Sequence, residues 1–110
     1  MAKKDAKSAN DTDALDGVTV GDVDSAVRQQ FDLPRDVKGA VVTDVDPDSA
    51  SYAAGLRPGD VILEIDRKPV NNAEEAVKLS ENIKGKASIL LRVWSKGGSH
   101  YLVVDESKVG

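Results

Sequence analysis

The chain has 110 residues, no cysteine, and 15 basic against 19 acidic residues, which gives a formal net charge of −4. This length suits one domain with a modest core, and the lack of cysteine excludes a disulfide framework and a thiolate metal site. No Lys/Arg cluster is interleaved with aromatic residues and no apolar run is long enough to span a membrane, so neither a nucleic-acid partner nor membrane insertion is expected.

The first part of the chain is polar, and order should begin after it. Residues 1–14 carry no large apolar side chain after the first methionine, and we expect a flexible linker or an artificial tail there. From Leu15 a glycine precedes a short β-branched strand that reaches Val20. A short helix should follow, with Asp24 as its N-cap, and it should end before Pro34.

The middle of the chain alternates strand and turn signals. Residues 39–46 have the alternation of a half-buried strand, and Asp48 or Ser49 can cap a short helix after it. Gly55 is placed to end that helix in a left-handed conformation, which costs glycine least. Pro58 and Gly59 then suit a tight turn. We expect Asp60 to cap amides of this turn rather than to act in catalysis.

After the turn, Val61, Leu63 and Ile65 are expected to form one fully apolar strand face. A brief edge pairing at Pro69 and Val70 should precede a helix that Asn71 or Asn72 caps and that runs to about Ile83. The last two strands are expected to form a hairpin, at residues 87–95 and 100–105, with Trp94 and Tyr101 facing each other across it. Residues 106–110 are interpreted as a frayed end.

These elements predict an α+β domain with a small, curved or barrel-like antiparallel sheet of about five or six strands and two or three helices. Domain order is therefore a tail at 1–14, one domain at 15–105 and a short frayed terminus. Serine residues lie in no Gly-x-Ser-x-Gly context, and His100 has no cysteine or histidine partner nearby. We expect no catalytic residue, no metal site and no cofactor, and we interpret the acidic residues as surface groups.

The run Gly55-Leu-Arg-Pro-Gly-Asp-Val-Ile62, followed by Ile65-Asp-Arg-Lys-Pro-Val70 and a helix from Asn72, resembles PDZ domains. It is most similar to the PDZ domains of bacterial Do-like (HtrA-type) serine proteases, and the resemblance extends from Leu15 to about Asp105. The order of strands and helices also resembles the circularly permuted form of these bacterial domains, in which the peptide-binding strand comes first and a hairpin comes last.

The resemblance implies that the domain binds peptide by β-augmentation. In such domains a loop directs backbone N–H groups at a peptide's terminal carboxylate, and the peptide then adds as a strand between the first strand and the long helix. The matching loop positions are Leu15, Asp16, Gly17 and Val18, and those of the pairing strand are Val18, Thr19 and Val20. On the helix, the groove side is assigned to Ala73, Val77 and Ser80. Gly17 and the valines also have a simpler interpretation, as a strand-entry glycine and core residues.

One position departs from the family pattern. An apolar residue normally precedes the loop glycine, whereas this chain has Asp16, with Asp11 and Asp13 close upstream. A carboxylate at that point would repel a peptide carboxylate by roughly 1 kcal/mol. Weak binding, binding of internal sequences and no peptide binding therefore remain alternatives.

The resemblance implies a non-catalytic module of a periplasmic Do-like protease, and the chain's end just past the last strand favours its second, C-terminal PDZ domain. Expected partners are peptide or protein C-termini, extended unfolded segments, and other domains or subunits of the parent protease, whose catalytic domain is absent from this sequence. The module would regulate substrate access or oligomer assembly. The alternatives are a structural assembly domain that never binds peptide, and a PDZ module of another bacterial envelope protein such as a processing protease or secretion component.

Overall fold

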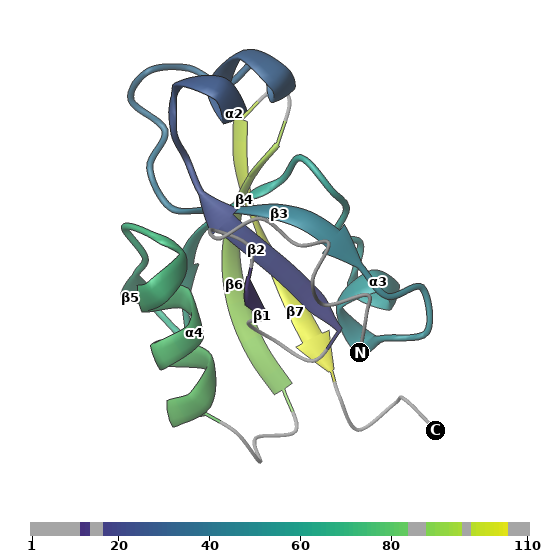
Figure 1. The fold of residues 1–110 in the computed structure, drawn as a ribbon. Coiled ribbons are helices and arrows are strands. Elements are labelled where there is room, and N and C mark those ends of the chain that lie inside the picture. Colours follow the sequence, from purple (N-terminus) through teal and green to yellow (C-terminus); the bar gives the residue numbers. More distant parts are fainter. Residues whose placement is uncertain (1–11, 14–16, 84–87, 96–97, 106–110) are drawn as a thin grey trace.

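One antiparallel sheet with three helices forms the domain in the computed structural model, which describes residues 12–13, 17–83, 88–95 and 98–105 (Figure 1). The strand order is β1-β2-β3-β4-β6-β7, and β5 pairs with β4. The strands are β1 (Thr12–Asp13), β2 (Val18–Asp22), β3 (Ala40–Val45), β4 (Val61–Ile65), β5 (Lys68–Pro69), β6 (Ser88–Ser95) and β7 (Gly98–Asp105). The helices are α2 (Ser25–Phe31), α3 (Ala50–Ala54) and α4 (Ala73–Asn82). The predicted α+β class is confirmed.

Each helix begins at a side chain that caps its first turn. The Asp24 carboxylate accepts a hydrogen bond from the Val27 N–H at 2.9 Å and starts α2. Ser49 and Asn72 cap α3 and α4 in the same way. Because these caps satisfy N–H groups that a helix cannot satisfy itself, the helix starts follow from local sequence. The cap predicted at Asp24 is confirmed, and of the alternatives predicted for the other two helices the structure uses Ser49 and Asn72.

The turn between α3 and β4 also has the predicted conformation. Gly55 ends α3 with φ of 109°, and Gly59 adopts φ of 97°. The Asp60 carboxylate accepts a hydrogen bond from the Arg57 N–H at 3.1 Å, so Asp60 caps the turn as expected. The Arg57 guanidinium in turn donates to the Tyr52 carbonyl at 2.9 Å and lies over the Tyr52 ring. This cation–π contact was not predicted.

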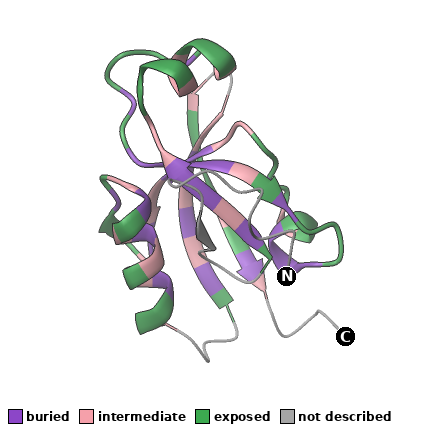
Figure 2. Ribbon diagram, viewed as in Figure 1, coloured by how far each residue is buried: buried purple, intermediate pink, exposed green. Residues whose placement is uncertain are grey.

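The core lies on both faces of the sheet, and Figure 2 shows buried residues along the central strands. The main cluster joins α4 to the inner strand faces, and a smaller cluster on the other face consists of Leu33, Val37, Val41 and Val61. At the start of β3, Ala40 and Val42 belong to the main cluster while Val41 belongs to the smaller one. The prediction of a half-buried strand at 39–46 is therefore wrong for these residues, because α2 and the loop after it cover the second face.

Two register shifts change which residues share a face. The β2–β3 pairing shifts between Thr19 and Val20, and the β4–β6 pairing shifts between Ile62 and Glu64. As a result Ile62 and Ile65 lie in the main cluster, while Val61 lies in the smaller one. The single apolar face predicted for Val61, Leu63 and Ile65 is wrong, because an irregular residue in a strand reverses the alternation beyond it.

The β6–β7 hairpin buries Ile89, Leu91 and Val93, as their alternation predicts. Its register places Tyr101 opposite Arg92 and Ser99 opposite Trp94. The predicted cross-strand pair of Trp94 and Tyr101 is therefore wrong, because Tyr101 lies two residues beyond the partner of Trp94.

The domain boundary at Leu15 stays a prediction. Two residues of the expected tail, Thr12 and Asp13, form β1 in the structure, while 1–11, 14 and 106–110 lie outside the described residues. Within the part of the chain that is described, no helix is long and apolar enough to cross a membrane.

Candidate functional site

The entry to β2 is fixed by Gly17, the described glycine of the predicted loop. Its φ is +79°, and its carbonyl accepts a hydrogen bond from the Asp46 N–H at 2.8 Å. A Cβ at this position would lie 2.7 Å from the Ser49 Cβ, closer than real contacts allow. Glycine is thus required here by conformation and packing, whatever its role toward a ligand. Leu15 and Asp16, the loop positions before it, lie outside the described residues.

In β2 the valine side chains belong to the core. Val18 and Val20 are buried in the main cluster, and Thr19 between them is half-buried. The simpler interpretation of both valines as core residues is therefore confirmed. What β2 can offer to a ligand is its backbone, since one long edge of the strand pairs with β3 and the other faces away from it.

The predicted helix row lies on the inner side of α4. Ala73 and Ser80 are buried, Val77 is half-buried, and α4 contacts both β1 and β2. The Ser80 hydroxyl donates to the Val77 carbonyl at 2.8 Å, so it is satisfied within the helix. The row therefore has small side chains at both ends and one valine between them.

Asp22 connects β2 to α4, and the sequence did not predict this contact. Its carboxylate, at the end of β2, accepts a hydrogen bond from the Ala73 N–H in the first turn of α4 at 2.8 Å. An anion at a helix N-terminus is favourable because unpaired N–H groups and the helix dipole converge there. The contact fixes the end of β2 to the start of α4 and so sets the spacing between strand and helix. The two residues are 51 positions apart, and no local pattern reveals the pair.

The outer edge of β2 carries a strand of the same chain. β1 pairs with it antiparallel, with Thr12 opposite Val20 and Asp13 opposite Thr19. The predicted pairing strand, β2, therefore accepts a neighbouring strand on this edge. That neighbour, β1, comes from the segment of the chain just before β2.

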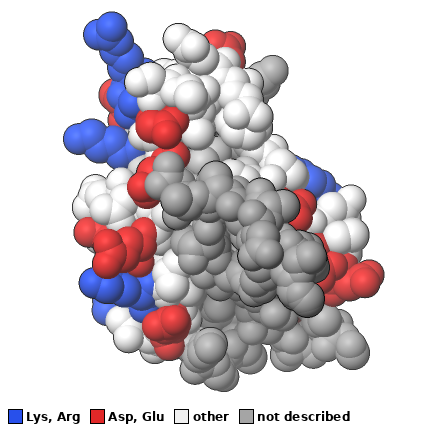
Figure 3. Space-filling view, viewed as in Figure 1, with Lys and Arg blue, Asp and Glu red and all other residues white. Residues whose placement is uncertain are grey.

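Charges of both signs lie together on the exposed side of α4. Figure 3 shows them interspersed over this helix, and Lys78 pairs with Glu74 at 3.6 Å with both side chains largely exposed. The face of α4 turned away from β2 is thus a solvated surface, as its sequence predicts.

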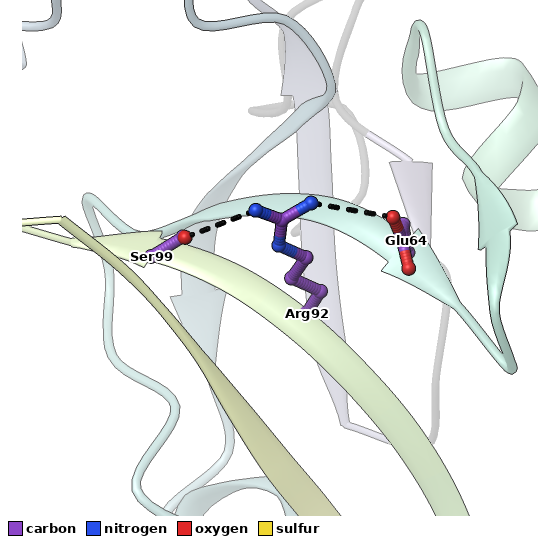
Figure 4. A network of polar contacts seen from close by, with 3 residues as sticks. All are labelled: Glu64, Arg92 and Ser99. Carbon is purple, nitrogen blue, oxygen red and sulfur yellow. Dashed lines mark hydrogen bonds and ion pairs between the residues drawn. The ribbon is translucent and has the colours of Figure 1, made fainter.

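The other face of the sheet holds a second polar arrangement (Figure 4). Arg92 on β6 reaches Glu64 on β4 at 3.4 Å and the Ser99 hydroxyl on β7 at 3.3 Å. A shallow, open depression of about 510 Å³ lies beside them, lined also by Val37, Leu63 and Trp94 among others. It contains the ion pair between Arg92 and Glu64, and Asp36 and Lys38 also line it. No group of His, Asp and Glu residues able to hold a metal ion occurs in the described part of the chain.

A family model described as "PDZ domain" matches residues 7–94. Among curated proteins, the chain is 33% identical over 104 residues to a DegP-like periplasmic serine endoprotease of Brucella suis, covering 92% of this chain and 19% of that protein. It is 30% identical over 97 residues to a do/HhoA-like periplasmic serine protease of Haemophilus influenzae, covering 88% and 18%. The chain thus spans about a fifth of the length of these relatives.

Two solved structures share the fold. The HtrA-type protease AlgW, solved with a decapeptide, matches with a TM-score of 0.73 at 26% identity, covering 81% of this chain and 27% of that one. The HtrA3 PDZ domain, bound to the phage-derived ligand FGRWV, matches with a TM-score of 0.63 at 21% identity, covering 81% and 80%. The strand and helix order predicted from the sequence is confirmed by these matches.

Proposed function

Because this chain belongs to the PDZ domain family, we propose that it is a peptide-binding module that takes an extended segment as an added strand along β2. The observation that carries the proposal is that the edge of β2 away from β3 accepts backbone pairing: the short strand β1 pairs with it at Thr19 and Val20. Backbone pairing supplies affinity without regard to side chain, and α4 supplies the opposite wall.

The loop before β2 would hold the end of the peptide. We assign this role to Leu15, Asp16, Gly17 and Val18, whose N–H groups would converge on a terminal carboxylate. Gly17 supports the assignment through its positive φ, which allows successive N–H groups to point the same way. The charge of Asp16 opposes an anionic end, so peptides with a free C-terminus should bind weakly, although the converging N–H groups still favour them over their amidated forms.

The helix wall is assigned to Ala73, Val77 and Ser80. Their small or β-branched side chains would accept one apolar peptide side chain of moderate size, and the contact between Asp22 and Ala73 would set the distance between this wall and β2.

The parent protein is proposed to be a Do-like periplasmic serine protease in which this module regulates substrate access or subunit assembly. Its relatives' names support the compartment and the protease class. Other domains or subunits of that protease would then be partners beside unfolded polypeptide, and the module would be the second PDZ domain of a tandem. Binding peptide, it would take part in protein quality control.

A second candidate is an assembly domain that binds no free peptide. One observation favours it: the β2 edge is already paired with β1.

The two candidates differ in a calorimetric titration with a peptide that has a free apolar C-terminus. A binding module gives saturable heat, which weakens for the amidated peptide if the loop holds a carboxylate. Val77→Glu should abolish binding because it places a charge on the apolar wall. Lys78→Glu, the same new residue on the exposed side of α4, should leave affinity within about twofold. No saturable heat with any peptide would favour the assembly domain.

A further inference from the structure

We propose that β1 is an internal competitor of peptide: Thr12–Asp13 pairs with the edge of β2 that an incoming peptide needs, and peptide binds by displacing it. The inference rests on the proposed function. It adds that the module's affinity is set by its own preceding segment as well as by the groove.

The strand order leaves β2 no second free edge. β2 lies between β1 and β3 in the sheet, and its pairing with β3 extends over the whole strand, from Val18 opposite Val45 to Asp22 opposite Ala40. A peptide can therefore add only on the side where β1 lies. At Thr19 and Val20 one backbone edge cannot pair with two strands at once.

The direction of β1 matches that of a bound C-terminal peptide. Because β1 is antiparallel to β2, it enters beside Val20 and runs toward Thr19, that is, toward the Gly17 end of the strand. A peptide whose last residue reaches the loop at Gly17 would run the same way. In addition, α4 contacts β1 as well as β2, so β1 lies within reach of both walls of the proposed groove.

Chain length makes this competition effective yet reversible. Only four residues separate Asp13 from Val18, so β1 is held near β2 at an effective concentration on the order of millimolar. The pairing involves two residues of β1, and short strand pairings of this kind are marginally stable in water. A peptide of ordinary length pairs with more of β2 and can replace it, at the cost of a lower apparent affinity.

The test removes the pairing of β1 with β2 and leaves the residues of β2 and α4 unchanged. The double variant Thr12→Pro, Asp13→Pro lacks both backbone N–H groups and cannot sustain the ladder. Thr12→Ala, Asp13→Ala is the matched control, because it changes the same side chains and keeps both N–H groups. For one peptide with a free apolar C-terminus, we expect the proline variant to bind about threefold or more tightly than both the wild type and the alanine variant, which accounts for the loss of the Asp13 charge.

Nuclear Overhauser contacts between 12–13 and Thr19–Val20 provide the independent readout. They should be present in the free wild-type chain and disappear at saturating peptide. Equal affinity of wild type and proline variant, or contacts that persist in the saturated complex, would overturn the competition while leaving peptide binding intact. If neither the wild type nor the proline variant binds any peptide, it is the proposed function that fails.

Discussion

Gly17 shows how a residue assigned to a binding loop is also required by the fold. Its backbone has φ of +79°, where a residue with a Cβ is strained, and its neighbour Ser49 lies where that Cβ would be. The sequence indicates that a glycine matters at this point, but it cannot separate ligand binding from packing, since Ser49 is distant along the chain.

Gly17→Ala should lower the free energy of unfolding by about 2 kcal/mol or more, from backbone strain and from the clash with Ser49. Gly55→Ala is the comparison variant, because Gly55 also has positive φ, +109°, while the nearest atom to a Cβ there is the Leu102 Cδ2 at 4.0 Å, an ordinary contact. Urea unfolding of both variants measures the difference. Equal losses at the two positions would show that the contact with Ser49 carries no cost.

Asp60 gives the stability of the domain a specific pH dependence. Burial raises the pKa of its carboxyl above the ordinary value of 3.8, although the hydrogen bond from the Arg57 N–H and the charges of His100 and Arg57 act against this. The unfolded chain therefore releases this proton at lower pH than the folded chain does. Between the two pKa values the folded state holds more protons, so stability falls as pH rises through that window and then levels off.

Asp60→Asn removes this titration, and its amide oxygen can still accept from the Arg57 N–H. The unfolding free energy of the variant minus that of the wild type should therefore rise from pH 3.8 upward and reach a plateau above the raised pKa. Urea unfolding of both proteins between acidic and neutral pH measures it. A difference that stays constant or falls over this range would refute the assigned role of burial.

The elements that follow from local chemistry were predicted well. Asp24, Ser49 and Asn72 each cap the helix that begins directly after them, so neighbouring residues determine where each helix starts. Gly55 likewise marks the end of α3.

Elements that depend on distant pairing were predicted poorly. The register shifts leave one extra residue in β3, Thr43, where it meets β2, and one in β4, Leu63, where it meets β6, and no residue pattern within a strand reveals them. β1 was missed for the same reason: Thr12 favours strands but Asp13 does not, and two residues in a polar segment give no strand pattern, so β1 forms because β2 offers an edge.

α4 should depend on Asp22 for its position against β2. Asp22→Ala leaves the Ala73 N–H without its acceptor and should cost about 1 to 2 kcal/mol of unfolding free energy and weaken peptide binding severalfold. Asp22→Asn keeps an acceptor oxygen and should restore most of both.

Asp24→Ala is the comparison variant for Asp22→Ala, because it removes a similar hydrogen bond, the cap of α2. It should lower stability by about 1 kcal/mol and leave peptide affinity unchanged. Urea unfolding and calorimetry on the same samples give both quantities. If the two alanine variants weaken binding equally, Asp22 has no special role in spacing the groove.

The molecule as a whole combines core clusters on both faces of its sheet with a β2 edge that pairs with the two-residue strand β1. The main cluster fixes β2 through Val18 and Val20, so the strand that would receive a ligand is rigid. The described positions that we assign to the groove, Gly17 to Val20 and the row on α4, come from parts of the chain more than fifty residues apart. Their assignment followed from family resemblance, whereas Asp22 and β1 became visible only in three dimensions.

The central claim is that an extended peptide adds along β2 opposite α4, and an amide-shift NMR titration of the ¹⁵N-labelled chain tests it most directly. Peptides with free apolar C-termini would be compared with the same peptides amidated. We expect shifts concentrated at Gly17 to Val20 and Ala73 to Ser80, reduced on amidation, with β6 and β7 unaffected. No shifts with any peptide, or shifts confined to the depression beside Arg92 and Trp94, would contradict the claim.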